Sequence, residues 1–332
     1  MLIKTMNKVI GKKVADWLKS VICEKTRKII EENLVITGGC FPSMIDNQAP
    51  KDFDCYFKTK EATKAVAEYY VGLWNEAHKD QKNKTGRVCK VFVLDGANPS
   101  KELLDYYQIS ETEQSKSRVI ANVTPERLKI IFPSDGVAGD TGAINKDEEL
   151  GSNVIDNITE VDETAADEIL EKEKKQYFPV FISTNAITLS NGVQIVVRFY
   201  GEPEKIHETY DFQHTKAYWT KSTGTVIPNE VYDAVINKTL IYTGSKYPVC
   251  SVFRLRKFIA RGWTINAGQL LKICMQVSQL DLMDIDTLED QLIGVDSLYF
   301  MQLIDQFRKM QEKDSNFHLT SGYIMSIVDK IF

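Results

Sequence analysis

Residues 38–54 read GGCFPSMIDNQAPKDFD, and the expected fold is built outward from this stretch. The β-branched run Leu34–Ile36 precedes it and predicts a strand that the glycine pair ends. Residues 53–57 alternate and predict a second strand. The segment therefore reads as a strand, a glycine turn, a short helix or loop, and a strand that begins with Asp-Phe-Asp.

The glycines and the acids of this stretch suit phosphate and metal chemistry. Gly38 and Gly39 would let backbone N–H groups approach a phosphate, and a helix that starts there adds partial positive charge. Residues two apart in a strand share a face, so Asp52 and Asp54 should project together while Phe53 packs inward. Two carboxylates on one face suit Mg²⁺ or Mn²⁺ bound together with substrate phosphates.

Each half of this pattern has an ordinary explanation. A glycine pair is usually only a turn, and an Asp-x-Asp on a strand is often a solvated edge. The combination is more specific, because the glycines and the carboxylates stand at a fixed separation between two β runs.

The rest of the chain predicts helices and strands in a recognisable order. Helical spacing covers residues 5–32 and 61–79, and short apolar runs at 88–94 and 128–132 predict strands. Ser190-Asn191-Gly192 separates two β-rich runs, 180–188 and 193–200, as in a hairpin. From residue 206 on the pattern is mostly helical, with helices expected near 227–239, 250–261, 266–279, 286–310 and 319–331.

These elements predict an α+β protein: a small mixed sheet with flanking helices, followed by an all-helical C-terminal domain. The expected divisions are an N-terminal helical segment (1–32), a head domain (33–220) and a helical neck and tail (221–332). An acidic insertion at about 135–175 should lie within the head.

Charge is unevenly spread along a chain whose formal net charge is −5. Residues 1–30 hold eight basic and two acidic side chains, a net of +6. Residues 135–175 hold thirteen acidic and four basic side chains, a net of −9. The basic helix at 5–28 could contact a polyanion; the alternative is a solvated face.

The six cysteines fit neither a zinc site nor a disulfide framework, which favours a reduced, cytoplasmic protein. The first residues are too charged for a signal peptide. No stretch of 18 apolar residues exists, so no membrane span and no membrane partner are expected.

The pattern Gly-Gly, twelve residues, Asp-x-Asp resembles the signature of the polymerase-beta-like nucleotidyltransferase superfamily. The ending Pro-Lys-Asp-Phe-Asp (50–54) is similar to the Pro-Lys-Asp-Ile-Asp of bacterial-type CCA-adding enzymes and poly(A) polymerases. Asp211-Phe212 with Ala217-Tyr218, and residues 253–265, resemble two later motifs of that family in the right order. Similar-looking proteins occur in bacterial viruses, and a bacteriophage-encoded member in a bacterial or infected host cell is one expectation.

The resemblance implies transfer of a nucleoside monophosphate from an NTP to a hydroxyl acceptor, with an RNA 3′ end as the leading acceptor. It implies that Asp52 and Asp54 bind metal, and that the nucleotide contacts are made by Gly38, Gly39, Ser43, Lys51, Arg254, Lys257 and Arg261. Asp211 is a candidate third catalytic acid. The alternatives are a capping role for Ser43, a solvated helix face for the basic group at 254–261, and junction roles for His207 and His214.

Several positions depart from the family pattern. Phe41-Pro42-Ser43 replaces Val-Arg-Asp, and the third acidic position falls near Gln194. Thr209 and Tyr210 replace two arginines, and the base-reading motif of the neck has no clear match. A second hypothesis is therefore a degenerate nucleotidyltransferase fold that binds or forms part of a viral particle. A third is a nucleotide-binding partner in a toxin–antitoxin system.

Overall fold

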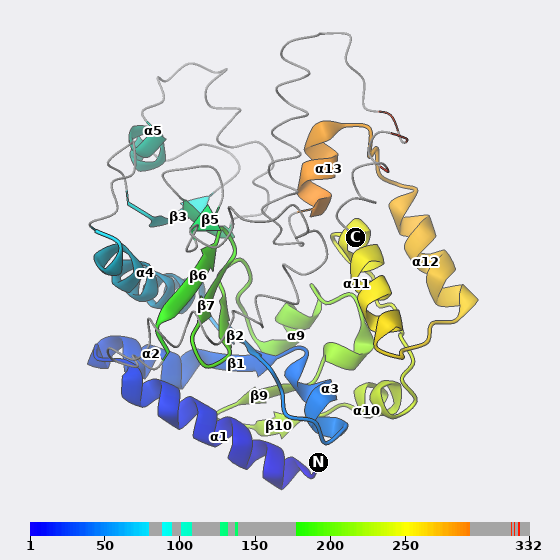
Figure 1. Cartoon of the computed structure of the whole chain (residues 1–332), viewed down its shortest axis with the longest axis horizontal. Helices are drawn as coiled ribbons and strands as arrows, with labels where there is room; N and C mark the ends of the chain where they lie inside the picture. The colour runs from blue at the N-terminus through cyan, green and yellow to red at the C-terminus, as the bar shows by residue number, and fades with distance from the viewer. Residues whose placement is uncertain are drawn as a thin grey trace, which may run out of the picture. The chain divides into compact units, whose positions relative to one another are not determined.

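A computed structural model of the protein describes residues 1–79, 88–94, 101–107, 127–131, 137–138 and 177–292, with Thr320, Gly322 and Met325 (Figure 1). The chain divides into two compact units. Unit 1 takes in the described residues of Met1–Gly139 and Gln176–Thr243, and unit 2 those from Gly244 onward.

In the described part of unit 1, an eight-stranded sheet has the order β10-β9-β1-β2-β8-β7-β6-β5. β2 pairs parallel with β8, and the other neighbours pair antiparallel, so the sheet is mixed. β3 (Lys90–Leu94) and β4 (Arg127–Ile131) form a separate antiparallel pair. The strands of the large sheet are β1 (Leu34–Thr37), β2 (Phe53–Phe57), β5 (Val137–Ala138), β6 (Pro179–Ser183), β7 (Ala186–Leu189), β8 (Val193–Val196), β9 (Tyr218–Thr220) and β10 (Gly224–Val226).

Helices surround this sheet in unit 1 and make up the described elements of unit 2. Those of unit 1 are α1 (Ile3–Ser20), α2 (Glu24–Asn33), α3 (Cys40–Ile45), α4 (Lys60–Ala77), α5 (Lys101–Tyr107), α9 (Pro203–His207), the 3-10 helix η1 (Gln213–Thr215) and α10 (Asn229–Ile236). Those of unit 2 are α11 (Pro248–Ala260), α12 (Ala267–Val277) and α13 (Ile285–Leu292).

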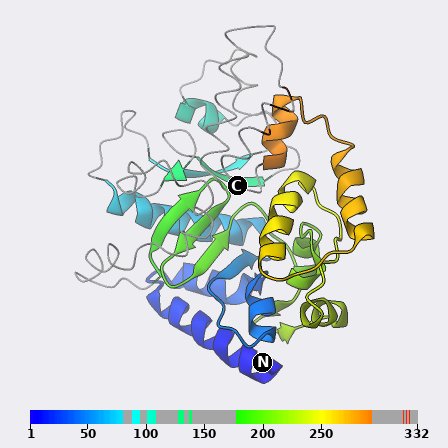
Figure 2. The ribbon, with the colours of Figure 1, turned by 45° about the vertical axis from the view of Figure 1, so that its right-hand side comes forward.

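One face of the sheet is apolar and forms the core. Its central row joins buried side chains of five strands: Trp219, Ile36, Cys55, Ile195 and Ile187 are successive register partners. Partners in register project to the same face, so this row lies on one side. The helices α1, α2 and α4 pack on that side (Figures 1 and 2).

The first helix shows why its sequence folds in this way. Met6, Ile10, Val14 and Trp17 of α1 recur at helical spacing and are all buried. The indole N–H of Trp17 donates to the Tyr70 hydroxyl at 2.6 Å, which joins α1 to α4 and satisfies a buried donor. The orientation of α1 on the sheet is therefore set by its apolar stripe.

The predicted α+β class and mixed sheet are confirmed, but the sheet is larger than the small one expected. No strand was expected at residues 218–226, which form β9 and β10. Strands of three residues are too short to show a period, and they form here because β9 pairs with β1. The run 180–188, expected as one β-rich segment, forms two strands, because the chain turns between β6 and β7.

The units differ in extent from the predicted divisions. Residues 1–32 belong to the same unit as the sheet, and unit 1 continues past residue 220 to Thr243. Of the predicted acidic insertion, only β5 is described, and it pairs with β6. The rest of the insertion, the helix expected at 319–331 apart from Thr320, Gly322 and Met325, and most of the one expected at 286–310 lie outside the described residues.

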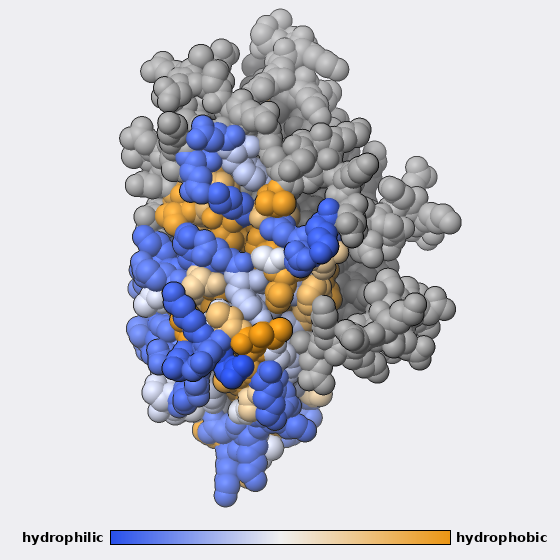
Figure 3. Space-filling view, turned by 90° about the vertical axis from the view of Figure 1, so that its left-hand side faces the viewer, coloured by the Kyte–Doolittle hydropathy of each residue, from blue (hydrophilic) through white to orange (hydrophobic). Residues whose placement is uncertain are grey.

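Two surface properties bear on function. Among the described helices, none combines the length and the apolarity that a membrane crossing requires. On the side of the molecule shown in Figure 3, hydrophilic residues predominate and hydrophobic residues form patches between them.

Candidate functional site

The glycine turn after β1 closes directly on a carboxylate of β2. Gly38 has a φ of +90°, a conformation that other residues rarely adopt. A Cβ added at Gly38 would lie 2.2 Å from Oδ2 of Asp54. The backbone N–H of Gly38 donates to the Thr215 carbonyl oxygen at 3.3 Å. Glycine is therefore required here both by the backbone conformation and by the approach of the carboxylate.

A polar row crosses the middle of the sheet on the face opposite the apolar core. Tyr218, Thr37, Asp54, Gln194 and Thr188 are successive register partners on β9, β1, β2, β8 and β7. Thr37 is buried, and the other four are half-buried. A polar row at the centre of a sheet is unusual, because such positions normally hold apolar side chains that pack on a neighbouring layer.

The hairpin turn between β7 and β8 holds the segment that carries Asp52. Asn191 and Gly192 have φ values of 66° and 70°, as a tight two-residue hairpin turn requires. The Gly192 carbonyl accepts from the Phe53 N–H at 2.9 Å, and a Cβ on Gly192 would lie 2.4 Å from the Lys51 carbonyl oxygen. This close approach places the exposed Asp52 at the start of β2.

Lys13 of α1 supports the same turn. Its ammonium group hydrogen-bonds to the Asn191 carbonyl and lies 5.3 Å from the ring centre of Phe53 and 5.7 Å from that of Tyr177. Burial lowers the pKa of Lys13, as expected for an ammonium packed between rings. Helix α1 is thereby tied to the beginning of β2.

Both carboxylates act on the same buried thiol. Burial raises the pKa of Cys40, the first residue of α3, and the charges of Asp54 and Asp52 and the neighbouring Cys55 raise it further. Burial also raises the pKa of Cys55, and Asp54 adds to the increase. Both carboxylates therefore lie close enough to Cys40 to disfavour its thiolate.

A half-buried imidazole supports the end of β1. The Thr37 hydroxyl donates to the Ala217 carbonyl oxygen at 2.7 Å and lies 2.8 Å from Nε2 of His207. A hydroxyl has one hydrogen, so with that hydrogen on Ala217 the donor in the second contact is Nε2 of His207. His207 then carries a proton on Nε2 and braces the residue that precedes Gly38.

Tyr210 approaches Asp54 from the segment after α9. Its hydroxyl donates to the Tyr56 hydroxyl at 3.1 Å. Burial raises the pKa of Tyr210, and the neighbouring Tyr56 and Asp54 add to the increase. Tyr210 also packs on the apolar cluster of Val35, Tyr56 and Ile206. A phenol therefore stands beside the β2 carboxylate at the position where the resembling family has an arginine.

The predicted third acid has different neighbours. Asp211 is 6% exposed, and its charge acts on His214 and Lys216. Within the described ranges, no three Asp, Glu, His or Cys side chains form a group that could hold a metal ion. A three-acid site of Asp52, Asp54 and Asp211, and a metal cluster of the two histidines with Asp211, are therefore both absent from the described structure.

The other predicted residues of the first motif lie around the turn. Gly39 precedes α3 in a right-handed helical conformation, and nothing lies within 4 Å of a Cβ built on it. The Ser43 hydroxyl donates to the Gly39 carbonyl at 3.2 Å, a contact within the helix and not a cap. Lys51 is exposed beside Asp52. Phe41 and Pro42, which replace family residues, are buried.

Arg254, Lys257 and Arg261 belong to unit 2. Arg254 and Lys257 are half-buried on α11, and Arg261 is exposed at its C-terminal end. Their spacing of three and four residues places them along one side of the helix. Their assignment to the nucleotide stays a prediction.

Acid should weaken the fold through the half-buried His207 and the buried His214. Burial lowers the pKa of His207 to about 4, with a further contribution from Lys216, and burial lowers the pKa of His214 to about 4. Because the unfolded chain takes up these protons near pH 6.5 and the folded chain only near 4, stability is complete above pH 6.5 and falls toward pH 4.

Urea unfolding at pH 7.5, 5.5 and 4.5 measures this loss. His207→Gln, which keeps an N–H donor for Thr37, should lose less stability than the wild type between pH 6.5 and 4.5. An equal loss in both proteins would contradict the assignment.

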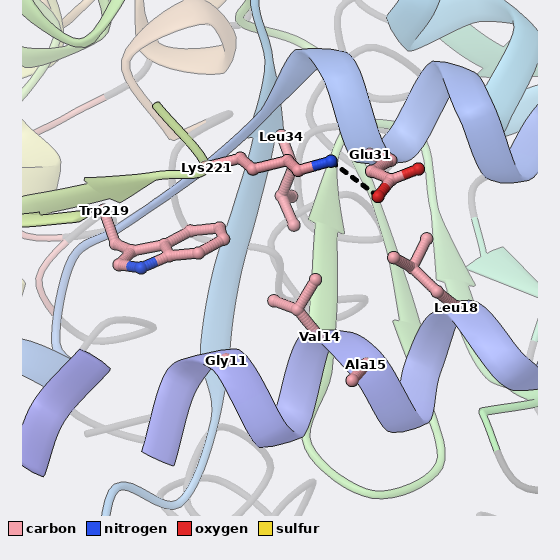
Figure 4. A pocket seen from close by; sticks show the side chains of 8 residues that line it. All are labelled: Gly11, Val14, Ala15, Leu18, Glu31, Leu34, Trp219 and Lys221. Carbon is pink, nitrogen blue, oxygen red and sulfur yellow. Dashed lines mark hydrogen bonds and ion pairs between the residues drawn. The ribbon is translucent and has the colours of Figure 1, made fainter. Parts of the chain in front are cut away.

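An apolar pocket of about 180 Å³ lies on the apolar face of the sheet, the face opposite the polar row (Figure 4). Val14, Leu18, Leu34 and Trp219 form its walls, together with Gly11 and Ala15. The ion pair of Lys221 with Glu31, 2.6 Å long, spans one side. The pocket is on the core side, away from the polar row, and it holds none of the predicted site residues.

Two residues near Asp54, Thr37 and Tyr210, were not predicted from the sequence as functional candidates. Thr37 is the polar end of a β-branched run directly before the glycine pair, and this signal was available. Tyr210 carries no local signal, because its place near β2 depends on a contact with the distant Tyr56. Tyr218, which the sequence suggested as a ribose or phosphate contact, joins the polar row through the pairing of β9 with β1.

Comparison with known proteins identifies one family. Curated proteins give no match to the chain. A model of the Gabija anti-defense 2 (Gad2) family of proteins matches residues 8–238, well over half of the 332 residues. The match includes Asp52, Asp54 and the whole polar row, and it ends before α11. This chain therefore belongs to the Gabija anti-defense 2 family.

Proposed function

We propose that this protein is a metal-dependent nucleotidyltransferase that transfers a nucleoside monophosphate from an NTP to a hydroxyl acceptor and releases pyrophosphate. One observation carries the proposal: the Asp54 carboxylate lies against the Gly38 turn, within a half-buried polar row. The sequence resemblance to the polymerase-beta-like superfamily supports it, since that pattern also joins a glycine pair to an Asp-x-Asp.

The side chains suit Mg²⁺ or Mn²⁺ that arrives with a substrate. Asp52 and Asp54 supply hard oxygen ligands, and their shared influence on Cys40 marks a common negative field. Mg²⁺ is usually held by one or two carboxylates plus substrate phosphates, and this donor set matches that habit. When bound, the ion would neutralise charge on the phosphates and on the attacking and leaving oxygens.

The two glycines have different roles in this proposal. The N–H of Gly38 is engaged by Thr215, so Gly38 makes room for the Asp54 carboxylate. Phosphate binding then falls to Gly39, where the space is open, with Lys51 supplying positive charge from the exposed segment beside Asp52. Ser43 can turn its hydroxyl toward a phosphate only by giving up the Gly39 carbonyl.

The reaction exchanges one phosphoester bond for another. The acceptor oxygen attacks the α-phosphorus, the bond from that phosphorus to the bridging oxygen of pyrophosphate breaks, and the acceptor proton passes to solvent or to a nearby base. An RNA 3′ end is the proposed acceptor. Because the family is described as Gabija anti-defense, we include in the proposal that the transfer counteracts Gabija defense.

A second candidate function is a degenerate fold that binds without catalysis. Gln194 stands beside Asp54 where a third acid is expected, and the described residues hold no group of three metal ligands. Retention of both carboxylates favours the enzyme, because two like charges side by side cost stability unless something binds them.

The test is incorporation of label from each of the four NTPs in turn. The protein is incubated with Mg²⁺ and a pool of small RNAs, and the wild type is compared with Asp52→Ala. Label that enters RNA with the wild type and not with the variant supports the proposal. Incorporation that survives in the variant would remove Asp52 from the site, and its absence in both proteins would favour the binding role.

A further inference from the structure

The outer face of α1 carries an evenly spaced line of positive charge. Lys4, Lys8 and Lys12, here called the α1 lysine row, are exposed and stand four residues apart. Successive members are separated by about 6 Å along the helix axis and share one face. The opposite face of α1 is the buried apolar stripe, so the row points away from the core of unit 1.

This arrangement weakens the helix that carries it. Like charges at a four-residue spacing destabilise a helix by roughly 0.2–0.5 kcal/mol per pair. Lysines near the helix N-terminus also oppose the helix dipole, and α1 has no acid in its first turn and no side-chain cap. Among the described residues, the ion pairs of α1 and α2 join Lys19 to Asp16, Lys28 to Glu24 and Lys221 to Glu31, all outside the row.

The row breaks two rules of helix stability, the one against like charges four residues apart and the one against positive charge near the N-terminus. Such violations are expected at functional sites. We propose that the α1 lysine row binds the phosphate backbone of a nucleic-acid strand. This inference rests on the proposed function in one respect, since it names the nucleic acid as the acceptor. The row suits phosphates, because ammonium groups act as point charges that need no fixed orientation of the partner.

Other partners fit the row less well. Protein interfaces are depleted in lysine and rich in aromatic anchors, and the row contains no aromatic residue. A helix that lies in a membrane surface buries its apolar face in lipid, whereas the apolar face of α1 is buried in the protein. The overall charge of −5 also means that attraction to a polyanion must come from a local patch.

The row has a fixed relation to the proposed catalytic strand. Lys13, the neighbour of Lys12, hydrogen-bonds to Asn191 and packs over Phe53, the first residue of β2. The turn that contains Asn191 also holds Lys51 and Asp52 in place. A strand bound along α1 is therefore held by the same unit that presents the carboxylates, although α1 packs on the face of the sheet opposite the polar row.

Fluorescence anisotropy with a labelled 20-nucleotide RNA, and with DNA of the same sequence, tests the proposal. The proteins are the wild type and the triple variant Lys4→Glu, Lys8→Glu, Lys12→Glu. The control is Lys25→Glu, Lys205→Glu, Lys221→Glu, three exposed lysines off α1 that give the same change in charge. Loss of three phosphate contacts should lower the slope of log affinity against log salt by about 2, and the control should lower it much less.

Stability supplies an independent measurement. Reversal of the row leaves like charges at the same spacing but places acids near the helix N-terminus, where the helix dipole favours them. The melting temperature of the row variant should therefore rise while its binding weakens. The neutral variant Lys4→Gln, Lys8→Gln, Lys12→Gln removes the repulsion between the lysines, so its melting temperature should also rise, and its binding should weaken less than that of the row variant. A purely structural role for the lysines predicts the opposite sign for stability.

Three results would overturn the inference: an unchanged salt slope in the row variant, an equal loss in the control, or no binding of RNA or DNA by the wild type at low salt. The binding assay contains no NTP, so it is separate from catalysis. Salt-dependent binding through the row without any nucleotidyl transfer would refute only the proposed function. Transfer by a protein whose row binds nothing would refute only this inference.

Discussion

Asp54→Asn should abolish nucleotidyl transfer while leaving the protein folded. The substitution keeps the size of the side chain and removes the charge from the carboxylate that faces Gly38. Metal ions contribute several kcal/mol to transition-state stabilisation, and each 1.4 kcal/mol is a factor of ten in rate. The expected loss is therefore roughly 10³-fold or more, measured as label incorporated from the preferred NTP.

Asp46→Asn is the matched control for this experiment. Asp46 follows α3 in the same connecting segment, and its carboxylate pairs with Lys238 at 3.3 Å. The same chemical change at this position should leave the rate within a few-fold of the wild type. Circular dichroism and thermal melting of both variants check that they fold. A fully active, folded Asp54→Asn protein would refute the assignment.

Gly38→Ala should damage both the fold and the activity. The new Cβ would lie 2.2 Å from Oδ2 of Asp54, and the φ of +90° is unfavourable for alanine. The backbone conformation alone costs roughly 1–2 kcal/mol, and displacement of the carboxylate adds to this. We expect the free energy of unfolding to fall by about 2–4 kcal/mol, in the range of severe single substitutions. At temperatures where the variant is still folded, the rate of transfer should fall at least about 10²-fold.

Two other glycines separate this effect from a general effect of alanine. Gly72 is exposed on α4, with nothing within 4 Å of an added Cβ, so Gly72→Ala should stabilise the helix by about 0.5–1 kcal/mol and leave activity unchanged. Gly39→Ala has open space and an ordinary φ, so its stability should stay close to that of the wild type.

A double variant tests the contact itself. In Gly38→Ala with Asp54→Ala, the side chain that clashes is gone, so part of the lost stability should return although activity stays absent. The strained φ remains, and recovery should therefore be incomplete. Strictly additive losses of stability in the two single variants would show that Gly38 and Asp54 do not interact.

Elements with strong local patterns were predicted well. The strands at 34–36 and 53–57, the helix at 61–79 and the Asn-Gly hairpin turn all appear in the structure. Each has a period or a turn signal within a few residues, so nearby side chains decide it. The alternation that places Asp52 and Asp54 on either side of Phe53 is of the same kind.

The surroundings of those acids depend on pairing between distant segments. Gln194 lies beside Asp54 because β8 pairs parallel with β2, and Tyr218 joins the row because β9 adds to the edge of β1. A three-residue strand has no period of its own, so β9 and β10 were not predicted. Asp211 was placed near the metal by analogy, whereas its described neighbours are His214 and Lys216.

The amino-acid sequence alone predicted the strand, the glycine turn and the spacing of the two carboxylates, because backbone conformation and side-chain alternation are local properties. Tertiary structure supplied the contact of Gly38 with Asp54, the polar row and the neutral His207 behind it. These features depend on hydrogen bonds between strands and on burial, and both arise only when segments separated by more than a hundred residues pair in one register.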